Sequence, residues 1–240
     1  YFSSTKRNGG DRDIYFMNPS KPEETILILQ VKGGGWGIND ISDDGKKLII
    51  GEYISANESH LYLLDTQTTK LEPITDRTEK QIVQGRAKFA KNPDEIFYIT
   101  DRDNEFARLA TFNLKTKKIN YFTSNIPWEV SNYALTKDRT KLAFQTNEGG
   151  LHKLYLMDTA NKKYSEVQGL PVGLIGGIDF SNDGKSLFFS QSTYESSADI
   201  YRLDLASNRV ERWTDSEQGE MQKSDMSQPK LIEWNSFDGM

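Results

Sequence analysis

Residues 44–75 read DGKKLIIGEYISANESHLYLLDTQTTKLEPIT, and residues 183–214 read DGKSLFFSQSTYESSADIYRLDLASNRVERWT. The two stretches align without a gap, and both run from an Asp-Gly pair through two apolar segments to a final Thr. Repetition on this scale is typical of architectures in which one unit cannot bury its apolar face alone. Further copies are therefore expected along the chain.

An apolar or aromatic run that ends in Asp or Asn recurs through the sequence. The runs end at Asn18, Asp65, Asn113, Asp158 and Asp204, at intervals of 45 to 48 residues. Tight-turn signals stand 20 or 21 residues before the last four of them, at Asp44-Gly45, Pro93-Asp94, Asp138-Arg139 and Asp183-Gly184. Several features in phase at one period indicate a repeat protein.

Each unit contains four strand-like stretches separated by turn residues, and the inner stretches are nearly continuous in apolar residues, as strands buried on both faces are. Four antiparallel strands in a unit of this length predict the blade of a β-propeller. The fold class is therefore all-β, with a partial first blade and four full blades, and we expect a fragment of a larger propeller. The predicted units are residues 1–30 for the partial blade, then 31–75, 84–123, 128–168 and 172–214.

The composition restricts the function classes. The chain has 240 residues, no cysteine and a formal net charge of −5, with both signs spread along it. Disulfides and thiolate chemistry are excluded, and a nucleic-acid binder would usually carry a basic patch. No apolar run approaches the roughly 18 residues of a membrane helix. We expect no cofactor, no metal, no nucleic-acid partner and no membrane partner.

Three stretches resemble a known family. They are YFSSTKRNGGDRDIYFMN from Tyr1, GEYISANESHLYLLD from Gly51, and the exit RWTDSEQGEM…QPKLIEWNSFDGM from Arg212. Together they resemble the propeller of prolyl oligopeptidase-family serine peptidases, in the acylaminoacyl-peptidase and dipeptidyl-peptidase-like branch, while the repeats themselves are TolB-like. The resemblance implies a propeller that caps an α/β-hydrolase domain and admits only oligopeptides. It also implies that residues 215–240 are a linker and an exit strand, PKLIEW, towards that domain.

Motifs that would make the chain an enzyme by itself are missing from the sequence. An α/β-hydrolase exposes its nucleophile in G-x-S-x-G, and this string does not occur. The two histidines, His60 and His152, stand where strands are predicted, and we interpret them as structural. The stretches DISDDG and DFSNDG resemble the start of an EF-hand loop, but Gly51 and Ser190 occupy the position of the required Glu. They are interpreted as hairpin turns, with a weak cation site as the alternative.

Candidate site residues lie in the loops that join second and third strands, because these loops share one face of a propeller with the connections between blades. They are charged or polar and would contact a hydrolase domain or the charged end of a substrate; a solvated rim is the structural alternative. The candidates are Arg7, Asp11, Arg12, Asn57, Glu58, Asp101, Arg102, Asp103, Glu105, Glu148 and Glu195.

The sequence thus leaves two functions from different classes. The first is a non-catalytic propeller that caps and gates a prolyl oligopeptidase-like serine peptidase, with that hydrolase domain and peptide substrates as its partners. The second is a TolB-like interaction scaffold without an attached enzyme. For the shape we expect an open arc, in which residues 229–234 do not pair with residues 1–5.

Overall fold

A computed structural model describes residues 1–232 and 234–238. The regular secondary structure of this part of the chain is almost entirely β-strand, with one short 3-10 helix, η1 (Lys223–Asp225). No helix in these ranges is both long enough and apolar enough to cross a membrane.

The strands form five antiparallel sheets in chain order. Sheet 1 contains β1 (Phe2–Ser4), β2 (Asp13–Asn18) and β3 (Lys21–Leu29). Sheet 2 contains β4 (Trp36–Ile41), β5 (Lys47–Ser55), β6 (Glu58–Asp65) and β7 (Leu71–Pro73). Sheet 3 contains β8 (Gln84–Phe89), β9 (Glu95–Thr100), β10 (Arg108–Asn113) and β11 (Ile119–Tyr121). Sheet 4 contains β12 (Glu129–Leu135), β13 (Lys141–Glu148), β14 (Leu151–Asp158) and β15 (Tyr164–Glu166). Sheet 5 contains β16 (Leu174–Phe180), β17 (Ser186–Thr193), β18 (Ser196–Asp204) and β19 (Arg209–Arg212).

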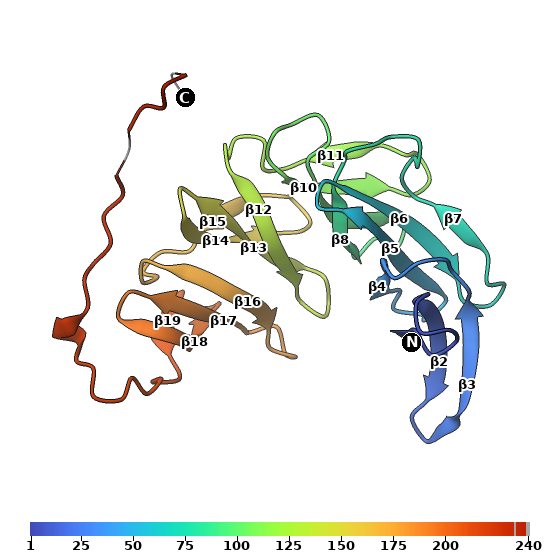
Figure 1. The fold of residues 1–240 in the computed structure, drawn as a ribbon, viewed down its shortest axis with the longest axis horizontal. Coiled ribbons are helices and arrows are strands. Elements are labelled where there is room, and N and C mark those ends of the chain that lie inside the picture. The colour runs from blue at the N-terminus through green and yellow to red at the C-terminus, as the bar shows by residue number, and fades with distance from the viewer. Residues whose placement is uncertain (233, 239–240) are drawn as a thin grey trace.

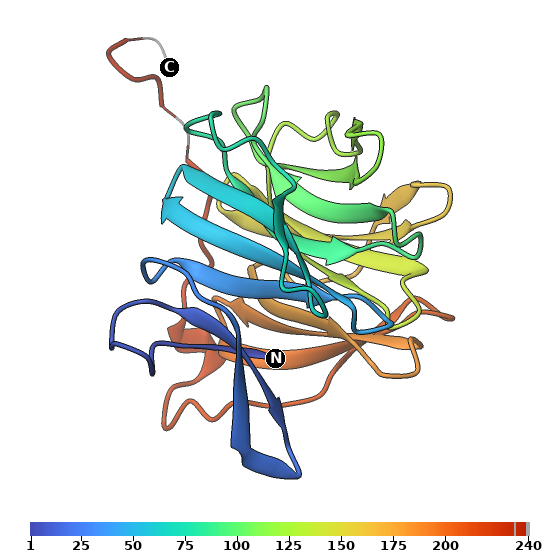
Figure 2. The ribbon, with the colours of Figure 1, turned by 90° about the vertical axis from the view of Figure 1, so that its right-hand side faces the viewer.

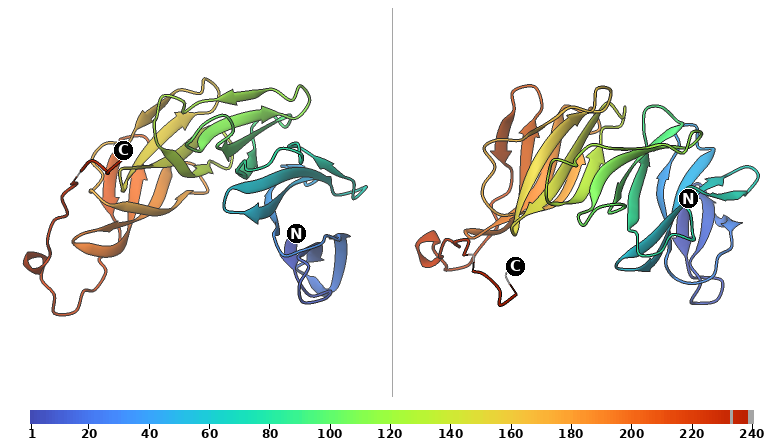
Figure 3. Two further views of the ribbon diagram at one scale, coloured as in Figure 1. Left: turned by 45° about the horizontal axis from the view of Figure 1, so that its top comes forward. Right: turned by 90° about the horizontal axis from the view of Figure 1, so that it is seen from above.

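The predicted fold class is confirmed, because each full sheet is a four-stranded antiparallel unit that follows the previous one around an arc (Figure 1). Sheet 1 has three strands, as expected for the partial blade. Sheets 1 and 5 lie at opposite ends of the arc (Figure 3). The β2–β3 hairpin projects beyond the neighbouring sheets (Figure 2).

The core lies between the sheets, in four apolar clusters that each join two neighbours. Between sheets 2 and 3, for example, Ile49 and Leu61 pack with Phe89 and Tyr98. In sheets 2, 3 and 4 the second strand supplies residues to an apolar cluster on each of its faces, which explains its nearly continuous apolar sequence. Each blade is therefore stable only beside another one.

The turns between first and second strands repeat one geometry. Gly45, Arg139 and Gly184 each donate a backbone N–H to the carbonyl three residues earlier, at 2.8 Å in all three turns. Their φ angles are 70°, 58° and 66°, in the left-handed region that favours glycine. The interpretation of DISDDG and DFSNDG as turns is confirmed, since Asp44 accepts a hydrogen bond from Ser42 Oγ at 2.7 Å within its own turn.

Arg139 is the exception at this turn position, and its side chain accounts for it. Its guanidinium donates to Asp40 Oδ2 of β4 at 2.9 Å, to Asp43 Oδ1 at 3.1 Å, and to the carbonyl of Phe89 in β8. One residue of sheet 4 is thus bonded to both sheets 2 and 3. These contacts tie three successive sheets together at the inner side of the arc.

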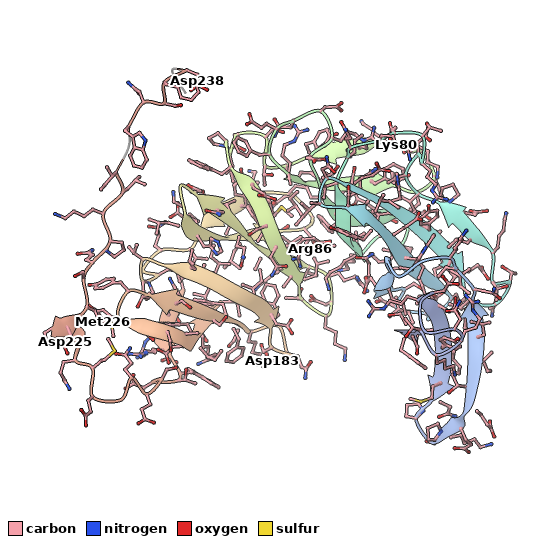
Figure 4. The ribbon with its side chains drawn as sticks, in the orientation of Figure 1. Lys80, Arg86, Asp183, Asp225, Met226 and Asp238 are labelled. Atoms are coloured by element: carbon pink, nitrogen blue, oxygen red, sulfur yellow. The ribbon has the colours of Figure 1, made fainter. Side chains whose placement is uncertain are left out.

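The chain after sheet 5 is irregular: Ser216 and Gln218 still bond to sheet 5 and its loop, and the tail beyond them runs apart from the sheets (Figure 1). Asp225, Met226 and Asp238 all lie on this tail (Figure 4). The prediction of a strand over Pro229–Trp234 is corrected for residues 229–232 and 234, which form none; Glu233 lies outside the described residues. A strand requires a partner edge, and Leu231 and Ile232 are instead about three-quarters exposed. No described backbone hydrogen bond joins this segment to residues 1–5, as expected for an open arc.

Candidate functional site

The loops between second and third strands gather at one end of the sheets, together with the connections between sheets; we call this end the loop face. The corresponding loops are residues 5–12, 56–57, 101–107, 149–150 and 194–195. Backbone bonds tie loops to connections, as from Arg12 N to Gly33 O at 2.9 Å and from His152 N to Gly173 O at 3.1 Å. The predicted candidates therefore lie on or beside a common face, within five separate loops.

In sheet 1, the candidates Arg7 and Asp11 belong to one closed network. Arg7 donates to Asp11 Oδ2 at 2.8 Å and to the buried Asp13 at 2.6 Å. Asp11 also accepts from the backbone N–H of Gly33 at 2.7 Å. The Gly33 bond, followed by those from Asn8 and Arg7, lowers the pKa of Asp11 to about 2. Arg12 is exposed and donates to Ser3 Oγ at 3.1 Å.

In sheet 2, Glu58 is held between a histidine and a lysine. Its Oε1 lies 3.1 Å from His60 Nε2 and 3.2 Å from Lys80 Nζ. The hydrogen bond with His60 and then that with Lys80 lower the pKa of Glu58. Asn57 is exposed and accepts from Ser55 Oγ at 2.7 Å. His60 is almost completely buried, so this pair serves the loop rather than a ligand in solvent.

In sheet 3, the densest charge cluster is largely committed to the preceding connection. Arg102 forms a double salt bridge with Glu79, and this contact lowers the pKa of that glutamate. Asp101 accepts the backbone N–H of Val83 at 2.8 Å. Asp103 and Glu105 are exposed. Arg102 and Asp101 thus fix the approach from sheet 2 to sheet 3, while the last two acidic residues face solvent.

In sheets 4 and 5, the predicted glutamates lie at the loop ends. Glu148 accepts from Tyr155 and Thr146 at 2.8 Å each, and its other oxygen lies 2.8 Å from Lys153 Nζ. Burial acts to raise the pKa of Glu148, but Lys153, Tyr155 and Thr146 together lower it. The backbone carbonyl of Glu195 accepts a hydrogen bond from the tail residue Gln218.

The structure therefore brings the candidates to one face but not into one cluster. The bonds described above for these side chains stay within one sheet and its loops or reach the adjacent connection. Among the described residues no group of three or more His, Asp or Glu side chains could hold a metal ion. The loop face is thus a rim on which many of the candidate charges are paired locally, while Asp103 and Glu105 are exposed.

The sequence did not predict one further candidate site. It is a hollow of about 330 Å³ between the inner strands of sheets 2 and 3. Its walls include Gly37 and Gly51 on one side and Gln84 on the other. Gln84 is 1% exposed, and neither its Nε2 nor its Oε1 has a hydrogen-bond partner within the described chain. The signal in the sequence would have been a glutamine at an inner-strand position where the other full blades carry apolar residues.

Comparison with known proteins gives a family. Residues 13–216 match the family model described as the N-terminal β-propeller domain of prolyl oligopeptidase. The chain belongs to this family. A comparison with curated proteins finds no match.

Solved structures agree with this propeller fold. Prolyl oligopeptidase B from Galerina marginata, bound to a 35mer hydrolysis and macrocyclization substrate, is 15% identical with a TM-score of 0.79, over 99% of this chain and 35% of that one. TolB from Acinetobacter baumannii is 15% identical with a TM-score of 0.66, over 88% of this chain and 51% of that one. The chain thus spans about a third to a half of the length of these proteins. At such identities the likeness concerns the fold alone.

Proposed function

We propose that this prolyl oligopeptidase-type propeller is a non-catalytic domain that caps and gates the active site of a serine peptidase, restricting access to oligopeptides. The observation that carries the proposal is the family match over residues 13–216, which is most of the 240 residues. In this proposal, residues 215–240 lead to a following α/β-hydrolase domain. The branch would be that of acylaminoacyl and dipeptidyl peptidases.

Steric exclusion is the mechanism that such a domain can supply. Adjacent sheets are joined by apolar clusters and by the hydrogen bonds of Arg139. This packing would hold neighbouring sheets in place, so that the wall of the arc would not part to admit a bulky molecule. A stiff wall admits an extended peptide and refuses a folded domain. The predicted residues of the loop face, such as Asp103 and Glu105, would then meet the hydrolase domain or the charged end of a peptide.

The second candidate is an interaction scaffold without an enzyme. It is favoured by the likeness to TolB over 88% of the chain, since a TolB-type propeller shares the same repeat. In that case the loop face would bind a protein partner, and no hydrolase would be encoded beside it.

The test is to read the gene beyond Met240 and to express the chain together with the domain encoded downstream. We expect G-x-S-x-G within the next few hundred residues. We also expect cleavage of a short chromogenic peptide but not of a folded protein that carries the same peptide in an exposed loop. A variant lacking residues 1–214 should lose this discrimination. A gene with no hydrolase after the propeller would overturn the proposal and favour the scaffold.

A further inference from the structure

The inner strands of the four full sheets place one residue at an equivalent position. This residue pairs with the second strand as Trp36 with Glu52, Gln84 with Thr100, Val130 with Thr146, and Ile175 with Gln191. All four inner residues are at most 8% exposed, and three of them are apolar. Gln84 is the exception, and burying an amide without a hydrogen-bond partner destabilises the fold. A glutamine that breaks the repeat without a structural partner suggests a function.

The surface opposite Gln84 is also unusual. Gly37 and Gly51 form a cross-strand pair on sheet 2, and the residues equivalent to Gly51 are Ile99, Gln145 and Ser190. Between sheets 3 and 4, Ile99 packs with Val130 and fills the interface. Between sheets 2 and 3, the side chain of Asn39 covers Gly51, and the hollow that Gln84 lines opens at Gly37. A Cβ placed on Gly37 would meet no atom within 4 Å, so the space begins directly at its backbone.

The lining determines which ligands fit. Glu52 is the one acidic or basic residue of this lining, and its oxygens are already engaged, by Tyr62 OH at 2.6 Å and Arg77 at 2.8 Å. An anion would therefore meet a carboxylate and no free cation. Gln84 offers both a donor and an acceptor, and its terminal torsion is broad enough for the amide to turn into the hollow. A neutral group with one acceptor and one donor side by side is the matching ligand.

An extended peptide has this arrangement, since the N–H and C=O of one residue point to the same side, as they do in a hydrogen-bonded antiparallel pair. Gly37 allows its backbone to approach closely, and Tyr53, which is 60% exposed, offers an apolar surface at the rim. The volume of about 330 Å³ is at the lower end of the about 300–1,000 Å³ usual for ligand sites. It accommodates a short segment rather than a whole oligopeptide.

We infer that the hollow between sheets 2 and 3 is a binding site for a neutral, extended peptide segment, with Gln84 bonded to the N–H and C=O of one residue. The peptide class rests on the proposed function, which the site would deepen by holding a substrate against the wall of the propeller. Sequence-independent binding is expected, because the amide would read only the backbone.

The test is titration of the 240-residue chain with N-acetylated, C-amidated tetra-alanine, followed by two-dimensional ¹H–¹⁵N NMR. We expect the side-chain NH₂ signals of Gln84, assigned by their loss in Gln84→Val, to shift with the backbone signals of Gly37 and Gly51. Gln84→Val and Gly37→Val should each weaken binding at least tenfold. Gly37→Val fills the hollow from a backbone that accepts a Cβ, so it leaves the amide in place and should not lower the melting temperature.

The matched control is Gln145→Val. Gln145 is also buried, but its amide donates to Ser131 Oγ at 3.2 Å and to the carbonyl of Ile175 at 3.4 Å. This variant should melt at a lower temperature and bind the peptide as the wild type does. Unmoved Gln84 signals at saturating peptide, or wild-type affinity in Gly37→Val, would overturn the inference. Because the measurement needs no hydrolase, its failure is distinguishable from a failure of the gating proposal.

Discussion

Sheets 2 to 5 all carry apolar residues at equivalent positions on the face that is turned towards the next sheet in chain order. This face is buried in sheets 2 to 4 and open in sheet 5. Leu61, Leu109 and Leu154 are fully buried, whereas the equivalent Ile200 is 38% exposed. Ile74 is 6% exposed, and the equivalent Trp213 is 59% exposed. The repeat therefore determines which residues point along the arc, and the presence of a neighbouring sheet determines whether they are buried.

The largest expected effect tests this comparison with one pair of truncations. Leu61→Ala should lower the free energy of unfolding by about 3 kcal/mol, because it leaves a cavity between sheets 2 and 3. Ile200→Ala should cost less than about 1 kcal/mol, because solvent already reaches that side chain. Urea denaturation of both variants measures the difference. Equal losses would mean that the face of sheet 5 is covered in solution.

Arg139 provides the second test, since it links sheets that the repeat alone would not join. Its side chain and that of Asp40 are 12% and 17% exposed, so their contact is poorly screened. Arg139→Ala should cost about 2 kcal/mol, as expected for hydrogen bonds to charged groups. Arg139→Gly should cost about 1 kcal/mol less than Arg139→Ala, because glycine accepts the φ of 58°.

The measurement is again the urea midpoint, with Lys137→Ala in the same turn region as an exposed control. If Arg139→Ala and the control are equally stable, the bond to Asp40 contributes nothing in solution. If Arg139→Gly is no more stable than Arg139→Ala, the turn geometry carries no strain.

Much of this architecture could be predicted from the sequence, and for a physical reason. Strand order, sheet membership and the turn at Gly45 follow from a local pattern that each unit repeats. The contact between Arg139 and Asp40 could not be predicted, because it joins residues 99 positions apart through the curvature of the arc. The hollow at Gln84 could not be predicted either, because it depends on the absence of a side chain at Gly37 in sheet 2. Residues 229–232 and 234 have the composition of a strand, but among the described residues they pair with no strand edge.

The candidate residues show the same division. Their common face could be predicted, because successive antiparallel strands run in opposite directions and so place equivalent loops at the same end of every sheet. Whether Arg102 would be free depended on Glu79, and whether Arg7 would be free depended on the buried Asp13. These partners come from different parts of the chain, and the sequence does not specify their distance.

A third, smaller effect concerns the two turn glycines. Gly184→Ala should lower the free energy of unfolding by about 1 kcal/mol, because alanine is strained at a φ of 66°. No steric cost is added, since the new Cβ would make only ordinary contacts with Thr136. Gly45→Ala should behave alike, since its φ is 70°. Gly37→Ala is the matched control without a positive φ, and its denaturation midpoint should not fall. Because Gly→Ala by itself lowers the entropy of the unfolded chain and favours folding, a shared loss in all three would mean that the positive φ is not what distinguishes the turn glycines.

The smallest effect at neutral pH concerns Asp199, which anchors the open sheet 5. Burial acts to raise its pKa, but hydrogen bonds from Ser196, Thr214, Arg212 and Ser216 outweigh this and hold the pKa of Asp199 well below its usual range. A carboxylate with a lowered pKa in the fold stabilises it fully above its unfolded value of 3.8, and this contribution is lost as the pH falls through the folded value. The protection factors of the β18 and β19 amides, which correct exchange rates for the intrinsic effect of pH, should therefore be unchanged between pH 6 and 5 and should fall below pH 3.8, more than those in β9. Asp199→Asn, which cannot ionise, should remove this acid dependence while leaving that of sheet 3 as it is. If β18 and β9 responded to acid alike in the wild type, the open face of sheet 5 would not depend on Asp199 for its order.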